Sequence, residues 1–281
     1  MNFSKLSVVI LLLLSFSFAN ADTDKVQAGG ILTVAEGKRL IGKSIARLPE
    51  VKKALEQGIV IICRGTTNTY VAEEILGQKF EHGPFTTGKI YPSTDAKKVS
   101  RGNPISEIVL INGKWEKEVS FKEALEQLKP GDVVIKGGNA LDYKNKLAGV
   151  CIGAPDGGTT GKFMPYVVAR KAHLIIPIGL EKQVTTDLIT LSEKMQEPIE
   201  YLSYVPSMFL LNGKIVTEIE AIKTFADVEA FDGASGGIGG AEGSTWIVVR
   251  GKKEEVEKAL KTIESVQGEK PFADTDTESK N

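Results

Sequence analysis

Four turns in the sequence combine glycine with hydroxyl, amide or charged side chains, and each follows an apolar, strand-like run. They contain Arg64, Gly65, Thr66, Thr67 and Asn68; Lys136, Gly137, Gly138 and Asn139; Asp156, Gly157, Gly158, Thr159 and Thr160; and Asp232, Gly236 and Gly237. Glycine lets a ligand approach the main chain, and the start of a following helix offers free N–H groups and partial positive charge. The turns therefore predict contacts with a phosphate or a carboxylate. The alternative is that glycine and threonine serve only turn formation and helix capping.

Three charged residues of these turns are candidates for catalysis. Lys136 ends an apolar run and precedes two glycines, where its ammonium group suits an anion held by neighbouring amides. Asp156 and Asp232 lie in glycine loops and could exchange a proton with a substrate, although loop aspartates also form turns. Glu242 and His82 are weaker candidates because spacing fixes no partner for them. The residues leave open whether the chain is an enzyme.

Cysteine and histidine are too few for a structural metal centre. Besides Cys63 and Cys151 the chain has only His82 and His173, so no zinc-binding spacing can be written. The two cysteines could form a disulfide in an oxidising compartment, or each could be a small buried hydrophobic residue within its apolar run. The sequence leaves both alternatives open and predicts no metal.

Two glycine-rich segments fail the standard nucleotide fingerprints. Around Gly161-Lys162, Asp156 stands in place of the first Walker glycine and Phe163 in place of the hydroxyl residue. The run beginning Gly237-Ile238-Gly239 reaches Glu242 where the dinucleotide motif needs glycine. The sequence therefore predicts no nucleotide cofactor, and no other cofactor.

Composition and charge limit the kinds of molecule that this protein is expected to bind. Lys and Arg number 35 against 36 Asp and Glu, a formal net charge of -1, so there is no global basic field to attract nucleic acid. The 42% hydrophobic content is typical of a globular chain with a sizeable core. We therefore expect a small anionic molecule as the partner; the oligomeric state is open.

The first residues have the pattern of a secretory signal peptide. Lys5 precedes an apolar run over residues 6–19, and Ala19-Asn20-Ala21 forms a small-x-small cleavage site. The run is shorter than the roughly 20 residues of a membrane-spanning helix. We expect cleavage after Ala21, a secreted or periplasmic mature chain beginning at Asp22, and no membrane insertion after cleavage.

The elements that would position the turns alternate between helix and buried strand. Helical periodicity over 35–57 is interrupted near Pro49, and short β-branched runs follow at 59–62, 133–135 and 174–176. This order predicts an α/β fold with an open, mainly parallel sheet and helices on both faces. Because ligands bind beyond the carboxyl ends of such strands, we expect the four turns to converge on one cleft.

The remaining segments predict an α+β carboxyl-terminal part with β-hairpins. Asn-Gly pairs at 112–113 and 212–213 are hairpin signals. A strand over 228–231 would lead into the turn at Asp232, and one over 149–153 into the turn at Asp156. We expect a single domain over 22–268, with 205–268 as an alternative subdomain, and a disordered tail over 269–281.

Two motifs carry a family resemblance over about half of the chain. Gly58-Ile-Val-Ile-Ile-Cys-Arg-Gly65-Thr66-Thr67, and later Val134-Ile135-Lys136-Gly137-Gly138-Asn139-Ala140-Leu141, resemble the sugar-phosphate isomerase and CoA-transferase superfamily, most closely ribose-5-phosphate isomerase. The resemblance implies that Gly65, Thr66 and Thr67 hold phosphate and that Lys136 lies beside the substrate. The segment 125–132 lacks that family's acidic Asp-Gly-Ala-Asp-Glu loop. Isomerase or acyl-transfer chemistry and non-catalytic binding therefore both stay open.

Overall fold

A six-stranded mixed sheet forms the centre of the molecule. The computed structural model describes residues 24–87, 90 and 104–272. The sheet has the order β10 (Lys214–Val216), β8 (His173–Pro177), β5 (Val133–Ile135), β2 (Ile59–Ile62), β3 (Ile108–Ile111) and β4 (Lys114–Trp115). The first four strands are parallel, and β3 and β4 run antiparallel to their neighbours. The prediction that 59–62, 133–135 and 174–176 form neighbouring buried strands is confirmed.

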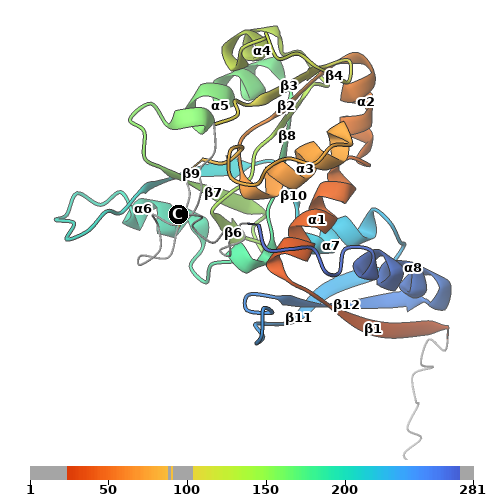
Figure 1. Ribbon diagram of the computed structural model, residues 1–281. Coiled ribbons are helices and arrows are strands. Elements are labelled where there is room, and N and C mark those ends of the chain that lie inside the picture. The colour runs from red at the N-terminus through yellow and green to blue at the C-terminus, as the bar shows by residue number, and fades with distance from the viewer. Residues whose placement is uncertain (1–23, 88–89, 91–103, 273–281) are drawn as a thin grey trace, which may run out of the picture.

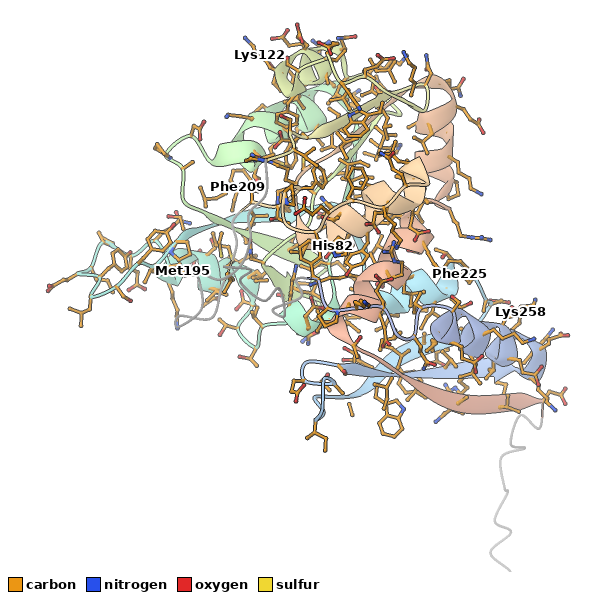
Figure 2. The ribbon with its side chains drawn as sticks, in the orientation of Figure 1. His82, Lys122, Met195, Phe209, Phe225 and Lys258 are labelled. Carbon is orange, nitrogen blue, oxygen red and sulfur yellow. The ribbon has the colours of Figure 1, made fainter. Side chains whose placement is uncertain are left out.

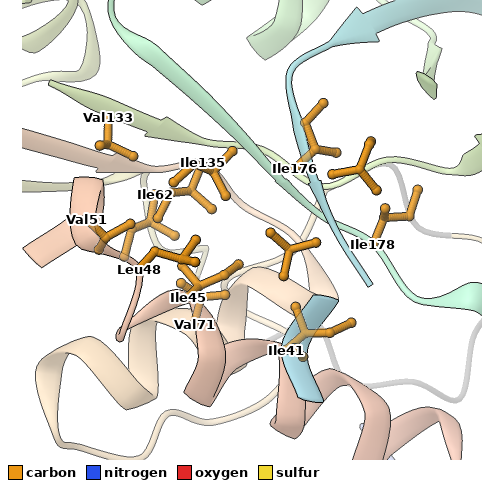
Figure 3. Packing of buried hydrophobic residues seen from close by; sticks show 14 of the residues in the cluster. Ile41, Ile45, Leu48, Val51, Ile62, Val71, Val133, Ile135, Ile176 and Ile178 are labelled. Carbon is orange, nitrogen blue, oxygen red and sulfur yellow. The ribbon is translucent and has the colours of Figure 1, made fainter. Parts of the chain in front are cut away.

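The apolar strands have the composition expected of a sheet covered by other elements. All residues of β2 and β5 are buried, and Figure 3 shows Ile62, Ile135 and Ile176 in one apolar cluster with Ile41 and Ile45 of α1 (Val34–Ile45). Since β-branched side chains pack well on a pleated surface, these runs favour strand over helix despite their short length.

The predicted break at Pro49 separates two helices. A capping box of Thr33 and Glu36 starts α1, and Pro49 occupies the first position of α2 (Pro49–Gln57), where its missing N–H has no intrahelical partner to lose. The other helices are α3 (Thr66–Leu76), α4 (Phe121–Gln127), α5 (Gly158–Arg170), the 3-10 turn η1 (Leu180–Lys182), α6 (Leu188–Lys194), α7 (Glu218–Lys223) and α8 (Lys253–Glu264). In the described part of the chain, no helix has both the length and the apolar character needed to span a bilayer.

Two antiparallel sheets flank the central one (Figure 1). The first has the order β1 (Lys25–Leu32), β12 (Thr245–Lys252) and β11 (Glu229–Ser235), with α8 packed against β1 and β12. The second has the order β6 (Ala140–Asp142), β7 (Leu147–Ile152) and β9 (Ser207–Asn212), with α6 packed against it. The fold is therefore α/β, with a mostly parallel sheet and additional antiparallel sheets.

The two Asn-Gly pairs behave differently. Asn112 and Gly113 have positive φ angles of 49° and 78° and join β3 to β4, so the first predicted hairpin is confirmed. The second, at Asn212-Gly213, is wrong, because β9 pairs with β7 whereas β10 pairs with β8 in the central sheet. A Cβ on Gly213 would lie 2.7 Å from the carbonyl oxygen of Leu174. Glycine is needed there for close approach and not for a turn.

The predicted signal peptide, residues 1–21, lies outside the described residues. The first residues of the predicted disordered tail differ from expectation. Glu269 pairs with Arg39 at 2.7 Å between side-chain oxygen and nitrogen, and the ring of Phe272 stacks on His82 with centroids 4.6 Å apart. Contacts with the buried Arg39 and the half-buried His82 hold residues 269–272 in place, although the composition of this segment is typical of disorder.

Candidate functional site

Polar side chains from five strands meet at one edge of the central sheet. The parallel strands β2, β5, β8 and β10 all end there, and β3 begins there because it is antiparallel to β2. The residues concerned are Arg64–Asn68, Lys136–Asn139, Gly179–Lys182, Thr217 with Glu218, and Glu107. The topology thus brings together charges that are far apart in the sequence.

The neighbouring strands β2 and β5 flank the topological switch point of the sheet. From β2 the chain continues through α3 to β3 on one side, whereas from β5 it continues to β8 on the other. Ligands in open α/β sheets bind where successive connections diverge in this way. Two of the predicted turns, Gly65–Asn68 and Lys136–Asn139, border this position.

Asn68 bridges the ends of β2 and β5 and is completely buried. Its Nδ2 donates to the carbonyl oxygens of Cys63 at 2.7 Å and Ile135 at 3.2 Å, which end β2 and β5. Because both partners can only accept, the amide orientation is fixed and Oδ1 points elsewhere. Oδ1 has no hydrogen-bond partner and lies 3.9 Å from the point where a Cβ of Gly137 would stand.

Lys136 lies beside Asn68 at the end of β5 and is only 8% exposed. Its Nζ donates to the carbonyl oxygen of Gly137 at 3.0 Å. Burial lowers the pKa of Lys136, and the charge of Glu107 partly offsets this effect. Within the described residues this amino group contacts a main-chain carbonyl and no carboxylate, so a bound anion would supply its counter-charge.

A second group of charges extends this row at the ends of β8 and β10. Lys182 Nζ donates to the carbonyl oxygen of Gly138 at 2.9 Å, and burial lowers its pKa to about 8. Lys38 of α1 is also buried, and its pKa is likewise lowered by burial. Burial, followed by repulsion from Glu181, raises the pKa of Glu218 to about 8, although Glu218 accepts the Leu180 N–H at 2.9 Å.

Glu107 links two of the predicted turns. Its Oε1 accepts hydrogen bonds from Arg64 Nε at 3.3 Å and from Thr159 Oγ1 at 3.2 Å. The turn over 156–161 therefore touches the site through Thr159. Asp156 itself is exposed, accepts the N–H of Gly158 at 2.8 Å and lies 3.7 Å from Lys162 Nζ, so it makes local turn contacts.

The expected convergence of all four turns is wrong for the turn at Asp232, and for the turn at Asp156 it holds only through Thr159. The strand before Asp156 is β7, which belongs to an antiparallel sheet, so its end does not share the edge of β2 and β5. Asp232 lies within β11, in the other antiparallel sheet, and the described residues include no hydrogen bond between the Asp232–Gly237 segment and the other turns. Residues Gly157, Gly158 and Thr160 belong to the start of α5, and Gly236 and Gly237 are exposed.

The two cysteines are free thiols. Cys63 follows β2 and is completely buried, and burial raises its pKa to about 12. Burial also raises the pKa of Cys151 in β7. Both thiols are therefore protonated near neutral pH, whereas nucleophilic chemistry requires the thiolate. Among the described residues, no group of three or more metal-ligating side chains is present.

His82, a weaker candidate from the sequence, belongs to a separate cluster on α1 and α3. Its ring edge meets Tyr70 at 5.1 Å between centroids, and its Nε2 lies 3.3 Å from Glu73 Oε1. Glu73 also pairs with the buried Arg39. Figure 2 shows His82 within the body of the molecule, and these contacts give it a packing role that also holds Phe272.

Sequence reasoning missed Lys38, Glu107, Glu181, Lys182 and Glu218. Gly179 lies just beyond a predicted strand. Treating a single glycine after a strand as a turn signal would have drawn attention to Glu181 and Lys182. Glu218 was missed because the wrong hairpin at 212–213 kept β10 out of the central sheet. Lys38 was missed because it lies in a helix and not in a turn after a strand. Comparisons with family models, with curated proteins and with solved structures found no match for this chain.

Proposed function

We propose that this protein binds an anionic small metabolite, through a phosphate or carboxylate group, at the sheet edge where β2 and β5 end. The glycine and threonine turn at the start of α3 would supply N–H groups, and Lys136 would supply charge. The resemblance to sugar-phosphate isomerases is part of the proposal, since it suggests phosphate at Gly65, Thr66 and Thr67. We further propose that binding takes place outside the cytoplasm, after removal of residues 1–21.

One observation carries the proposal. Lys38, Lys136 and Lys182 lie along one sheet edge, and within the described ranges none of their ammonium groups lies within 4 Å of a carboxylate oxygen. Burying a charge without a partner is costly, and proteins normally pair such groups. Two buried lysines, Lys38 and Lys136, and the half-buried Lys182 form no ion pair in the described structure, and an anion that binds among them is the best explanation.

Binding without catalysis is better supported than an enzyme built on the predicted acids. Asp156 and Asp232 were the candidates for proton transfer. Asp156 follows β7, Asp232 lies in β11 and Lys136 follows β5, and these three strands belong to three different sheets. We also propose that helices cover both faces of the central sheet and that an α+β carboxyl-terminal part completes a rigid frame around the site. Isomerase or acyl-transfer chemistry is the alternative, and it would have to use other residues.

A thermal-shift screen of anions, starting with inorganic phosphate, acetate and citrate, tests the proposal on the mature chain. The best anion would then be titrated by calorimetry against Lys136→Met, which keeps the apolar stem and removes the charge. We expect binding to weaken by roughly 1–3 kcal/mol, the range for a charge-assisted hydrogen bond. Lys223→Met, at an exposed position of α7, is the matched control and should bind like wild type. Unchanged affinity in Lys136→Met would overturn the proposed site.

A further inference from the structure

An exposed apolar arm, residues 196–206, connects α6 to β9. Figure 1 shows this segment extending away from the rest of the molecule at the left. The arm contains no helix or strand, yet it carries large apolar side chains that face solvent. Their exposed fractions are 60% for Ile199, 44% for Tyr201, 95% for Leu202, 76% for Tyr204 and 39% for Val205. Single exposed apolar residues are ordinary on a protein surface, whereas a contiguous group of them marks a contact surface.

Local contacts hold the arm in one shape. Pro198 and Pro206 restrict the main chain near its two ends, and the arm contains no glycine. The hydroxyl of Tyr201 donates to the main-chain carbonyl oxygen four residues earlier at 2.6 Å, which closes a turn. The hydroxyl of Tyr204 lies 2.9 Å from the point where a Cβ of Gly153 would stand, so the arm meets the turn after β7. A preshaped arm loses little conformational entropy on binding, which favours recognition of a partner over a role as a flexible linker.

The apolar surface of the arm is large enough for a stable interface. A large side chain has roughly 150–250 Å² of surface, so the exposed fractions of the five side chains correspond to about 600 Å². The largest apolar patch on an ordinary monomer is about 300–600 Å² and often has a function. Two copies that each buried one arm would remove about 1,200 Å² from the arms alone. With the surface that the arms cover, the contact would lie within the roughly 1,200–2,000 Å² of stable protein interfaces.

A groove of about 510 Å³ lies at the base of the arm. One wall comes from the turn after β7 and the other from the start of β9, and the apolar lining consists of Ile152, Ala154, Pro155, Met208 and Phe209. Gln196, the first residue of the arm, also lines the groove, so arm and groove are neighbours on the molecule. A twofold axis beside them would place the arm of each copy in the groove of the other. One symmetric contact would then cover both apolar surfaces of both copies.

The charge of the arm opposes two other kinds of partner. Its only charged residues are Glu197 and Glu200, so it carries two negative charges and no positive one. An anionic bilayer surface or a nucleic acid would repel it. A second copy of the chain offers an apolar groove, which accepts the apolar side chains and leaves both carboxylates at the solvated rim.

We infer that two copies of this chain form a symmetric dimer in which the arm of each copy lies in the groove of the other. Leu202, the most exposed side chain of the arm, is the anchor at the centre of the contact. The inference is independent of the proposed function. The arm and the groove belong to the antiparallel sheet of β6, β7 and β9, whereas the proposed anion site lies where β2 and β5 of the central sheet end.

Analytical ultracentrifugation of the mature chain from about 1 to 100 µM tests the inference. We expect a dimer that dissociates in the micromolar range or below. Leu202→Asp should raise the dissociation constant at least about thirtyfold, because it places a charge where an apolar anchor is buried. Ile238→Asp is the matched control, since Ile238 is 88% exposed in the loop after β11, and it should dimerise like wild type. Leu202 is exposed in the single copy, so circular dichroism should show both variants folded as wild type.

A variant of the groove tests where the arm binds. Ala154→Glu, at an exposed position of the groove wall, should raise the dissociation constant at least about tenfold by placing a charge against the apolar arm. A dimer that Leu202→Asp weakens and Ala154→Glu does not would overturn the placement of the arm in the groove. A wild-type chain that stays monomeric at about 100 µM, or a dimer that Leu202→Asp leaves unchanged, would overturn the whole inference. Binding of such a monomer to phosphatidylcholine vesicles would instead identify the arm as a membrane contact.

Discussion

Replacing Lys182 with Met should make the unliganded protein more stable near neutral pH. The ammonium group is taken out of water on folding, and its folded-state pKa of about 8 lies below the ordinary value of 10.5. At pH 7 the group is charged in both the folded and the unfolded chain, so the folded state carries the whole desolvation cost. That difference in pKa corresponds to about 3 kcal/mol. Met keeps most of the apolar stem and has no charge to desolvate.

The net gain is smaller because the variant loses the hydrogen bond from Nζ to the carbonyl oxygen of Gly138. Such a bond contributes about 1 kcal/mol, and the partly exposed stem lowers the desolvation cost further. We therefore expect Lys182→Met to be about 1–2 kcal/mol more stable than wild type at pH 7. As the pH rises from about 8 to 10.5, the folded wild type releases this proton before the unfolded chain does. Wild-type stability then rises relative to the variant, and the gain disappears.

Urea unfolding at pH 7, 8, 9 and 10 measures this difference directly, with Lys223→Met as the exposed control. The control should show no pH-dependent difference from wild type in this range. A Lys182→Met variant that is less stable than wild type at pH 7, or a difference that stays constant up to pH 10, would refute the argument that a desolvated ammonium group is held at this edge.

Three further expectations concern other residues. Thr67 is buried, and its Oγ1 has no hydrogen-bond partner in the described structure. Thr67→Val should therefore leave the unliganded protein as stable as wild type, or up to about 1 kcal/mol more stable, in urea unfolding. A clear loss of stability would show that the hydroxyl has a structural partner. Gly213→Ala should destabilise by about 1–3 kcal/mol because its Cβ would press on Leu174, whereas Gly251→Ala, with its nearest contact at 3.4 Å, should be nearly neutral. Expressed with its leader, the exported chain should begin at Asp22 on amino-terminal sequencing, and an exported chain that keeps Met1 would contradict the predicted cleavage.

The central strands were predictable because their residues permit few alternatives. Four or more consecutive β-branched residues, as in β2, need burial on both faces, and in a chain with helical segments between them this favours a parallel sheet. Pro49 likewise marks the start of α2 by a local rule. These predictions depend on residues that are close in the sequence, and this local information was sufficient to place both elements.

The antiparallel sheets were not predictable in the same way. The apolar run of β7 resembles a buried parallel strand, but it pairs antiparallel with two strands. One partner, β6, lies just before it across residues 143–146 and was missed in the sequence, whereas the other, β9, comes from a distant part of the chain and no local rule selects it. The Asn-Gly pair at 212–213 has the composition of a hairpin, whereas close approach to Leu174 explains its glycine. The first error placed the predicted turn at Asp156 at the wrong sheet edge, and the second hid Glu218.

The half of the site that sequence reasoning found, Asn68 and Lys136, follows strands in the central sheet. The half it missed comes from strand ends that have no repeated glycines. Glu218 lies at the sheet edge because β10 pairs with β8, and Lys38 lies there because α1 packs against α7 and β8. The charge of the site is therefore a property of the tertiary fold, since only the fold brings three unpaired lysines and two carboxylates together. A ligand that balances them would stabilise the folded chain by mass action. Under the proposed function, that coupling would offset the cost of keeping these charges in a protein whose individual turns look ordinary.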